Sequence, residues 1–296
     1  RMTNLNVVNN TIHNTFQGIY IANTNNLNIE HNLVEHTGSY AVNIRNNNFM
    51  KLHNNIIREY AETNYLAHGV WVYEKSNNTQ ITNNDIGGGY HSPIQIFHRY
   101  SDYKDQYAYN LVRDNHCHHA GYGLMDDMGG ITALFVAPGV SIDHNYCHDI
   151  YSKTYCGGGF LTGSNSYDVW FTNNLVHDTS HNSIKCDLGQ YIHVHNNILT
   201  FNAQSVLTHT SNTENLQWDI HKNIFVFNST ILMGAFNNKA AINDIDNNIY
   251  WHSTGAEINF RKMTFEAWQS EPFNHDQNSY IVDPLFVNMN RENGKE

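Results

Sequence analysis

The sequence has little charge, and this shortage excludes several classes of protein. Only 15% of its 296 residues are charged, against 40% that are hydrophobic, whereas a disordered chain combines high net charge with few aromatic residues. The formal net charge of −11 repels phosphate, and the chain has no Lys/Arg-rich run, so we expect no nucleic-acid partner. No apolar run approaches the roughly 18 residues that a membrane-spanning helix needs, so we expect no membrane partner.

Cysteine is also scarce, and its four positions match no common zinc motif and no secreted disulfide framework. Cys117 and Cys147 each follow a recurring asparagine by two residues, a place that other repeats fill with an aliphatic residue, so we expect them to face the core. Cys186 alternates with polar neighbours and is expected to point inward too, whereas Cys156 lies in a loop. A disulfide between stacked coils and the redox compartment both stay open.

A short word recurs through the chain: a polar pair ending in Asn, any one residue, then an apolar residue or Cys. The closing asparagines are Asn10, Asn32, Asn55, Asn84, Asn115, Asn145, Asn174, Asn197, Asn223 and Asn248. Their spacing runs from 22 residues (10 to 32) to 31 (84 to 115), which is typical of solenoid coils with inserted loops. Stacked coils lie about 4.8 Å apart, so we expect these side chains to form a hydrogen-bonded ladder at a tight bend that favours left-handed backbone.

Short alternating runs flank each word and predict strands with one buried face. Examples are 18–21, 40–44, 93–96 and 183–186 after the words, and 27–29, 79–82, 169–172 and 192–195 before them. Two or three strands per coil, without a helical period, predict an all-β chain that is a single right-handed parallel β-helix of about ten coils. The coils are expected over residues 1–262 and a C-terminal capping segment over 263–296. The start, 1–4, resembles neither a signal peptide nor a cap, so we expect the chain to begin inside a longer protein.

The widest spacings run consecutively from Asn55 to Asn174, so inserted loops cluster on the central coils and predict the binding face there. Within this stretch, Asp126 and Asp127 precede a glycine pair where the chain re-enters a strand, and at least one acid is expected to face outward. A hydrolase needs a second carboxyl group, for which Asp187 and Glu74, each two coils from Asp127, are the candidates. A turn-capping role for the first pair is the alternative.

We expect substrate contacts from aromatic, imidazole and cationic side chains in and just beyond the same stretch. They are Trp71, Tyr73, His91, His98, Arg99, His119, His181, Lys185 and His209. Lys185 shares one face of its strand with Asp187, and both are expected to project outward if Ile184 and Cys186 point inward. The pair His98 and Arg99 suits an anionic sugar group, with a structural ion pair as the alternative.

Two histidine groups raise the question of a metal. One consists of His116, His118 and His119, and the other of His193 and His195, which share one face of a strand. Neither group has a carboxylate or cysteine companion in a familiar spacing, so we expect no metal and no cofactor.

The chain resembles right-handed β-helix carbohydrate-active enzymes, in particular glycoside hydrolase family 141 and related pectate-lyase-like proteins. The matching segments are Asp127-Met128-Gly129-Gly130-Ile131, Pro138-Gly139, His148-Asp149-Ile150-Tyr151-Ser152 and the ending Asp283-Pro284-Leu285-Phe286. The resemblance implies a presumed catalytic acid at Asp127 and a substrate with fucosidic or xylan linkages. It departs at Gly159-Phe160-Leu161-Thr162-Gly163-Ser164, where family members carry an Asp-Glu pair.

Together these features predict a secreted or periplasmic glycoside hydrolase that cleaves an extracellular polysaccharide, anionic or fucose-containing, with Asp127 and Asp187 as the carboxylate pair. A polysaccharide lyase is the first alternative, with Arg99 or Lys185 neutralising a uronate carboxylate. A non-catalytic carbohydrate-binding solenoid is the second, because the Asp-Glu pair of the family is missing. The sequence leaves the sugar, the stereochemical outcome and the oligomeric state open.

Overall fold

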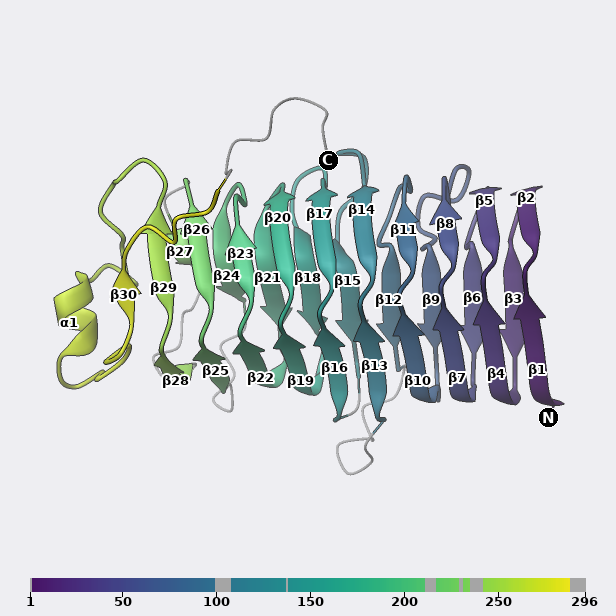
Figure 1. Cartoon of the computed structure of the whole chain (residues 1–296), viewed down its shortest axis with the longest axis horizontal. Helices are drawn as coiled ribbons and strands as arrows, with labels where there is room; N and C mark the ends of the chain where they lie inside the picture. Colours follow the sequence, from purple (N-terminus) through teal and green to yellow (C-terminus); the bar gives the residue numbers. More distant parts are fainter. Residues whose placement is uncertain are drawn as a thin grey trace.

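The computed structural model describes residues 2–98, 108–136, 138–210, 217–228, 231–234 and 242–287. These residues form three parallel sheets whose strands stack side by side along the long axis of the molecule (Figure 1). Each turn of the chain contributes one strand to each sheet in the same order, so the strands from β1 to β29 pair with strands three places away in sequence, and β30 then pairs with β29. The predicted parallel β-helix is therefore confirmed, with nine coils that have a described strand in all three sheets.

Sheet A precedes the asparagine bend in each coil. Its strands are β1 (Met2–Val8), β4 (Thr24–Glu30), β7 (Asn48–His53), β10 (Asn77–Thr82), β13 (Asn110–Arg113), β16 (Val140–Asp143), β19 (Tyr167–Thr172), β22 (Gln190–His195), β25 (Trp218–His221) and β28 (Ile242–Asp246). Sheet B follows the bend. Its strands are β2 (Thr11–Thr15), β5 (Leu33–Thr37), β8 (Ile56–Arg58), β11 (Asp85–Gly87), β14 (His116–Ala120), β17 (Tyr146–Ile150), β20 (Leu175–Thr179), β23 (Ile198–Thr200), β26 (Ile224–Phe227), β29 (Ile249–His252) and β30 (Tyr280–Ile281).

Sheet C completes each coil and carries the predicted alternating runs. Its strands are β3 (Ile19–Ala22), β6 (Val42–Arg45), β9 (Val70–Tyr73), β12 (Ile94–Phe97), β15 (Met128–Leu134), β18 (Gly157–Gly163), β21 (Asn182–Asp187), β24 (Ser205–His209) and β27 (Ile231–Gly234). Ile184 and Cys186 of β21 are fully buried, and Lys185 and Asp187 lie on the outer face, as predicted. Cys117 and Cys147 face each other across β14 and β17 in the core, and all four cysteines are free thiols.

The asparagine ladder is confirmed from Asn10 to Asn248. At Asn115, the side-chain Nδ2 donates to Asn145 Oδ1 at 3.0 Å and to the backbone oxygen of Ile81 at 2.9 Å. Its Oδ1 accepts from both the backbone N and the Nδ2 of Asn84, at 3.1 and 2.9 Å. The left-handed conformation is one residue earlier than the sequence suggested. It belongs to the first member of each polar pair, such as Asp114 with φ of 54°, which frees the second member for the ladder.

The described part of the segment after residue 262 covers the last coil. Helix α1 (Phe265–Gln269) begins at Thr264, whose hydroxyl accepts from the backbone N of Ala267, and it buries Trp268 completely. Trp268 Nε1 donates to the carboxylate of Asp276 at 2.7 Å, and burial raises the pKa of that carboxyl group. With five residues, α1 is much too short to span a membrane, and no other described helix has the length and apolar character of such a span.

Candidate functional site

Three side chains from the central coils converge at sheet C. Asp127 lies directly before β15, Cys156 directly before β18, and Asp187 ends β21. One ligand atom of each, a carboxylate oxygen or the thiol sulfur, lies within 4.8 Å of the others. Asp127 is exposed and Asp187 is partly buried, so the pair of carboxylates is open to solvent. The structure thus brings together the two acids that the sequence nominated as a pair.

Gly157 allows the segment that carries Cys156 to pack closely against the neighbouring coil. A Cβ atom at Gly157 would lie 2.2 Å from Ser180 Oγ and 2.5 Å from Ser152 Oγ, which is far inside van der Waals contact. Any larger residue would therefore push β18, and Cys156 before it, away from the neighbouring coil.

Lys185 is the cation of the site. Its Nζ donates to the thiol sulfur of Cys156, lies 3.4 Å from Asp187 Oδ2, and sits 5.6 Å from the centre of the Tyr155 ring. Desolvation acts to lower the pKa of Lys185, but Cys156 and Asp187 outweigh it and the pKa is raised, so the ammonium group stays charged at neutral pH. Burial raises the pKa of the Cys156 thiol to about 11, even though Lys185 acts in the opposite direction.

Asp126 and His181 form hydrogen bonds with the backbone of the segment that precedes Cys156. The carboxylate of Asp126 accepts from the backbone N of Thr154 at 2.6 Å and of Tyr155 at 3.1 Å. Desolvation acts to raise the pKa of Asp126, and these hydrogen bonds overcome it and lower the pKa. His181 is buried, and its Nε2 donates to the backbone oxygen of Thr154 at 2.9 Å. Both predicted site residues therefore hold the segment that leads into Cys156.

Trp71 and Tyr73 belong to an aromatic row on the outer face of sheet C. The Trp71 ring stacks on Tyr40 with centroids 4.6 Å apart, and Tyr73 stacks on Phe97 at 5.6 Å. Trp71 occupies the same register position as Lys185, four strands away along β9, β12, β15, β18 and β21. At about 4.8 Å per strand, this is a separation of roughly 19 Å between backbones.

Several other predicted site residues do not join this cluster. Glu74 follows β9, four strands from β21, and its carboxylate pairs with Arg45 at 2.6 Å. His119 lies on β14 in sheet B, where its Nε2 is 3.5 Å from Asp149 Oδ2. His209 shares the inward register position of Cys186 and is completely buried, and burial lowers its pKa to about 4.

The imidazoles of His91 and His98 are also buried, and burial lowers the pKa of each to about 4. His98 Nε2 accepts from Asn110 Nδ2 at 3.0 Å, so this ring is buried against sheet A and does not lie on the outer face, where it was expected to contact substrate. Arg99, its predicted companion, lies outside the described residues.

The lowered pKa of His98 predicts that the free energy of unfolding depends on pH. Its pKa is about 4 in the folded state, against 6.5 as the ordinary value, so the unfolded chain binds the proton more tightly. The contribution to stability is therefore complete above pH 6.5 and is lost as the pH falls toward 4. We expect urea unfolding to show that His98→Gln reduces the loss of stability between pH 7.5 and 5.0 by about 2 kcal/mol. An unchanged pH dependence in this variant would show that His98 does not titrate as its burial requires.

The expectation that the histidine groups lack carboxylate companions is wrong, because neighbouring coils supply them. Asp85 Oδ1 lies 3.0 Å from His116 Nδ1 and 2.9 Å from His118 Nε2. Asp219 Oδ2 lies 3.1 Å from His193 Nδ1 and 2.9 Å from His195 Nε2. The ladder spacing contained this signal, because Asp85 follows Asn84 just as His116 follows Asn115.

Three members of the carboxylate site were not predicted from the sequence: Cys156, Tyr155 and Thr210. Thr210 Oγ1 donates to Asp187 Oδ1, and the ladder contained this signal, because Thr210 follows Asn197 by 13 residues just as Asp187 follows Asn174. Cys156 and Tyr155 lie in an inserted loop, where the repeat gives no register.

Comparison with known proteins agrees with the fold. A family described as "Right handed beta helix region" matches residues 2–86, which cover the first coils. No curated protein and no solved structure matches the chain. The family match and the three parallel sheets make this chain a right-handed β-helix protein, with a fold that is common among enzymes acting on polysaccharides.

Proposed function

We propose that this chain is a glycoside hydrolase that cleaves an extracellular polysaccharide, with Asp127 and Asp187 as its carboxylate pair. The observation that carries the proposal is the approach of their carboxylate oxygens to within 4.8 Å. A glycosidic bond is broken by two carboxyl groups, one of which protonates the leaving oxygen while the other attacks the sugar or activates water. Such an enzyme acts outside the cytoplasm, where its substrate is found.

The approach of one oxygen atom of each acid to within 4.8 Å favours a retaining mechanism. Retaining enzymes hold their carboxyl groups about 5–5.5 Å apart, whereas inverting enzymes leave about 6.5–9.5 Å for a water molecule. Asp187 receives a hydrogen bond from Thr210 and forms an ion pair with Lys185, and these two contacts orient it as the nucleophile. Asp127 is exposed beside it and takes the role of acid and base.

Lys185 favours an anionic substrate and argues against a lyase in which Lys185 itself is the base. A charged ammonium group at the site attracts a carboxylate or sulfate group on the sugar. A lyase needs a neutral amine or another base to remove a proton, and the raised pKa of Lys185 opposes that role. The aromatic row through Trp71 and Tyr73 offers stacking surfaces for further sugar units along sheet C.

The test is a panel of anionic and fucose-containing glycans, with proton NMR of the first product formed. We expect new reducing ends that keep the anomeric configuration of the substrate. Inversion would contradict the retaining assignment. Ultraviolet absorbance from an unsaturated uronide would identify a lyase instead, and binding without any product across the panel would identify a carbohydrate-binding solenoid.

A further inference from the structure

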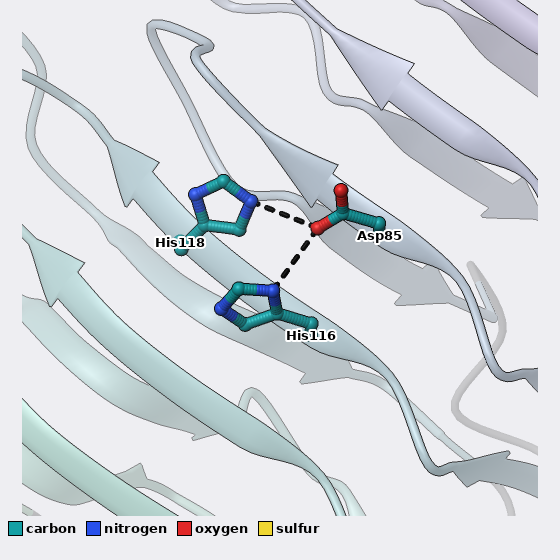
Figure 2. A group of neighbouring side chains, drawn as sticks. All are labelled: Asp85, His116 and His118. Carbon is teal, nitrogen blue, oxygen red and sulfur yellow. Dashed lines mark hydrogen bonds and ion pairs between the residues drawn. The ribbon is translucent and has the colours of Figure 1, made fainter. Parts of the chain in front are cut away.

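A second group of polar side chains lies on sheet B, apart from the proposed carbohydrate site. Asp85 is on β11, and His116 and His118 are on the neighbouring strand β14. Both imidazoles point at the same carboxylate oxygen, from His116 Nδ1 at 3.0 Å and from His118 Nε2 at 2.9 Å (Figure 2). The exposed fractions of the three side chains are 39%, 32% and 19%, so an ion from solvent can reach them.

Gly87 on β11 makes room for this arrangement. It is the register partner of His118, and a Cβ atom at this position would lie 2.5 Å from His118 Cε1 and 2.7 Å from its Nδ1. The imidazole of His118 therefore leans across the neighbouring strand toward Asp85, which a side chain at residue 87 would prevent.

The far side of each imidazole is bound to a second histidine, and both paths end on Asp149. His116 Nε2 lies 2.7 Å from His148 Nε2, and His148 Nδ1 lies 2.8 Å from Asp149 Oδ2. His118 Nδ1 lies 2.8 Å from His119 Nδ1, and His119 Nε2 lies 3.5 Å from Asp149 Oδ2.

These contacts fix the direction of the hydrogen bonds on the path through His148. A carboxylate only accepts, and a neutral imidazole has one donor and one acceptor nitrogen. His148 therefore donates to Asp149 and accepts from His116, which leaves the lone pair of His116 Nδ1 facing Asp85. His119, whose Nε2 lies 3.5 Å from Asp149, is placed to accept from His118 in the same way, and His118 Nε2 then also faces Asp85 with a lone pair.

The geometry of the three atoms suits a cation. The rings of His116 and His118 stack with centroids 4.2 Å apart, and each directs one nitrogen at Asp85 Oδ1. One divalent ion satisfies all three atoms at once. Metal-bound histidines typically donate their other N–H to a further acceptor that fixes the tautomer, and His148 and His119 are placed to be these acceptors here.

We propose that Asp85, His116 and His118 bind a divalent first-row transition metal ion such as Zn²⁺ or Co²⁺. Two imidazoles and one carboxylate are ligands that suit these ions, and three protein ligands leave a position for water. A tetrahedral ion with bonds of about 2.0–2.1 Å separates its ligand atoms by roughly 3.4 Å, so the observed 2.9 and 3.0 Å need widening by only a few tenths of an ångström. The ion joins two adjacent coils.

The group around Asp219 lacks this arrangement and serves as the comparison. His193, His195 and His221 each lie within 3.1 Å of one of its two carboxylate oxygens. Each of these imidazoles can donate an N–H to Asp219, because among the described residues no chain of further histidines directs its lone pair toward that carboxylate. Ordinary hydrogen bonds therefore satisfy this group.

The test consists of two titrations of the chelator-treated chain. Binding of Co²⁺ is monitored by its visible absorption, and binding of Zn²⁺ is measured by calorimetry. Loss of an outer partner of a metal ligand costs about 10–100-fold in affinity, so we expect that range for His119→Ala and a larger loss for Asp85→Asn, His116→Ala, His118→Ala and Gly87→Ala. His13→Ala, which removes an exposed histidine from the same sheet, and Asp219→Asn should leave this binding step unchanged.

Circular dichroism of the metal-free variants shows whether each remains folded, and Gly87→Ala adds a change that removes no ligand. Saturable binding that is lost in the four variants of the site and kept in the two controls supports the proposal. Absence of saturable binding by the wild-type chain overturns it, as does binding that is lost in Asp219→Asn and kept in Asp85→Asn.

Discussion

Asn115→Ala is expected to lower the free energy of unfolding by about 3–5 kcal/mol. The substitution removes the Oδ1 that accepts two N–H groups of Asn84 and the Nδ2 that donates to Ile81 and Asn145. All of these groups are buried, and each buried group left without a partner costs about 1–3 kcal/mol. Urea unfolding monitored by circular dichroism measures the change.

Asn10→Ala is the matched control, because Asn10 stands at the beginning of the described ladder. Its backbone N and Nδ2 donate to Asn32 Oδ1, and its side chain is exposed, so water replaces much of what is lost. We expect a change of about 1 kcal/mol or less. Equal effects at Asn10 and Asn115 would mean that the ladder adds nothing beyond one local bend.

Asp127→Asn is expected to lower turnover by about 10²- to 10⁴-fold while the chain stays folded, because loss of a general acid removes that factor. Asp127 is exposed at the entrance to β15, so the substitution leaves the core unchanged. Asp187→Asn should have an effect at least as large, since it removes the nucleophile. Initial rates on the glycan identified by the panel, together with circular dichroism, measure both.

Glu74→Gln tests whether Glu74, in place of Asp187, is the carboxyl group that acts with Asp127. Glu74 lies four strands from β21 and pairs with Arg45, so we expect turnover to stay within about twofold of wild type. A loss in Glu74→Gln that matches the loss in Asp187→Asn would show that the second carboxyl group has been assigned to the wrong coil. Full activity of Asp127→Asn would remove the catalytic role of that acid altogether.

The repeat made most of the fold predictable. The asparagine word fixed the stacking of the coils, and the alternation in 183–186 identified which side chains face outward. The ladder also relates positions at equal distances from their asparagine, so it aligns Asp219, four residues before Asn223, with His193, four before Asn197. The carboxylate companions of the histidines were therefore predictable in principle, although local spacing alone did not reveal them.

The carboxylate site was less predictable because inserted loops intervene between the ladder and its residues. Asp127 and Cys156 follow loops of different construction, and their approach depends on the packing of Gly157 against Ser152 and Ser180. The burial of His98 and His209 could not be predicted either. Histidine is a polar residue, and its place in an alternating run does not reveal that its ring is enclosed in the coil.

The ladder has a direction, and this distinguishes the two ends of the stack. From Asn32 to Asn223, each ladder asparagine donates to the Oδ1 of the asparagine in the following coil, and its own Oδ1 accepts from the asparagine in the preceding coil. A whole coil inserted in the middle would therefore join the series without a mismatch. Asn248 is the last rung and has no further asparagine to bond. Its backbone N donates to Ser279 Oγ and its Nδ2 donates to Asp276 Oδ1. The segment after residue 262 thus terminates a run of aligned amide dipoles as well as covering apolar side chains.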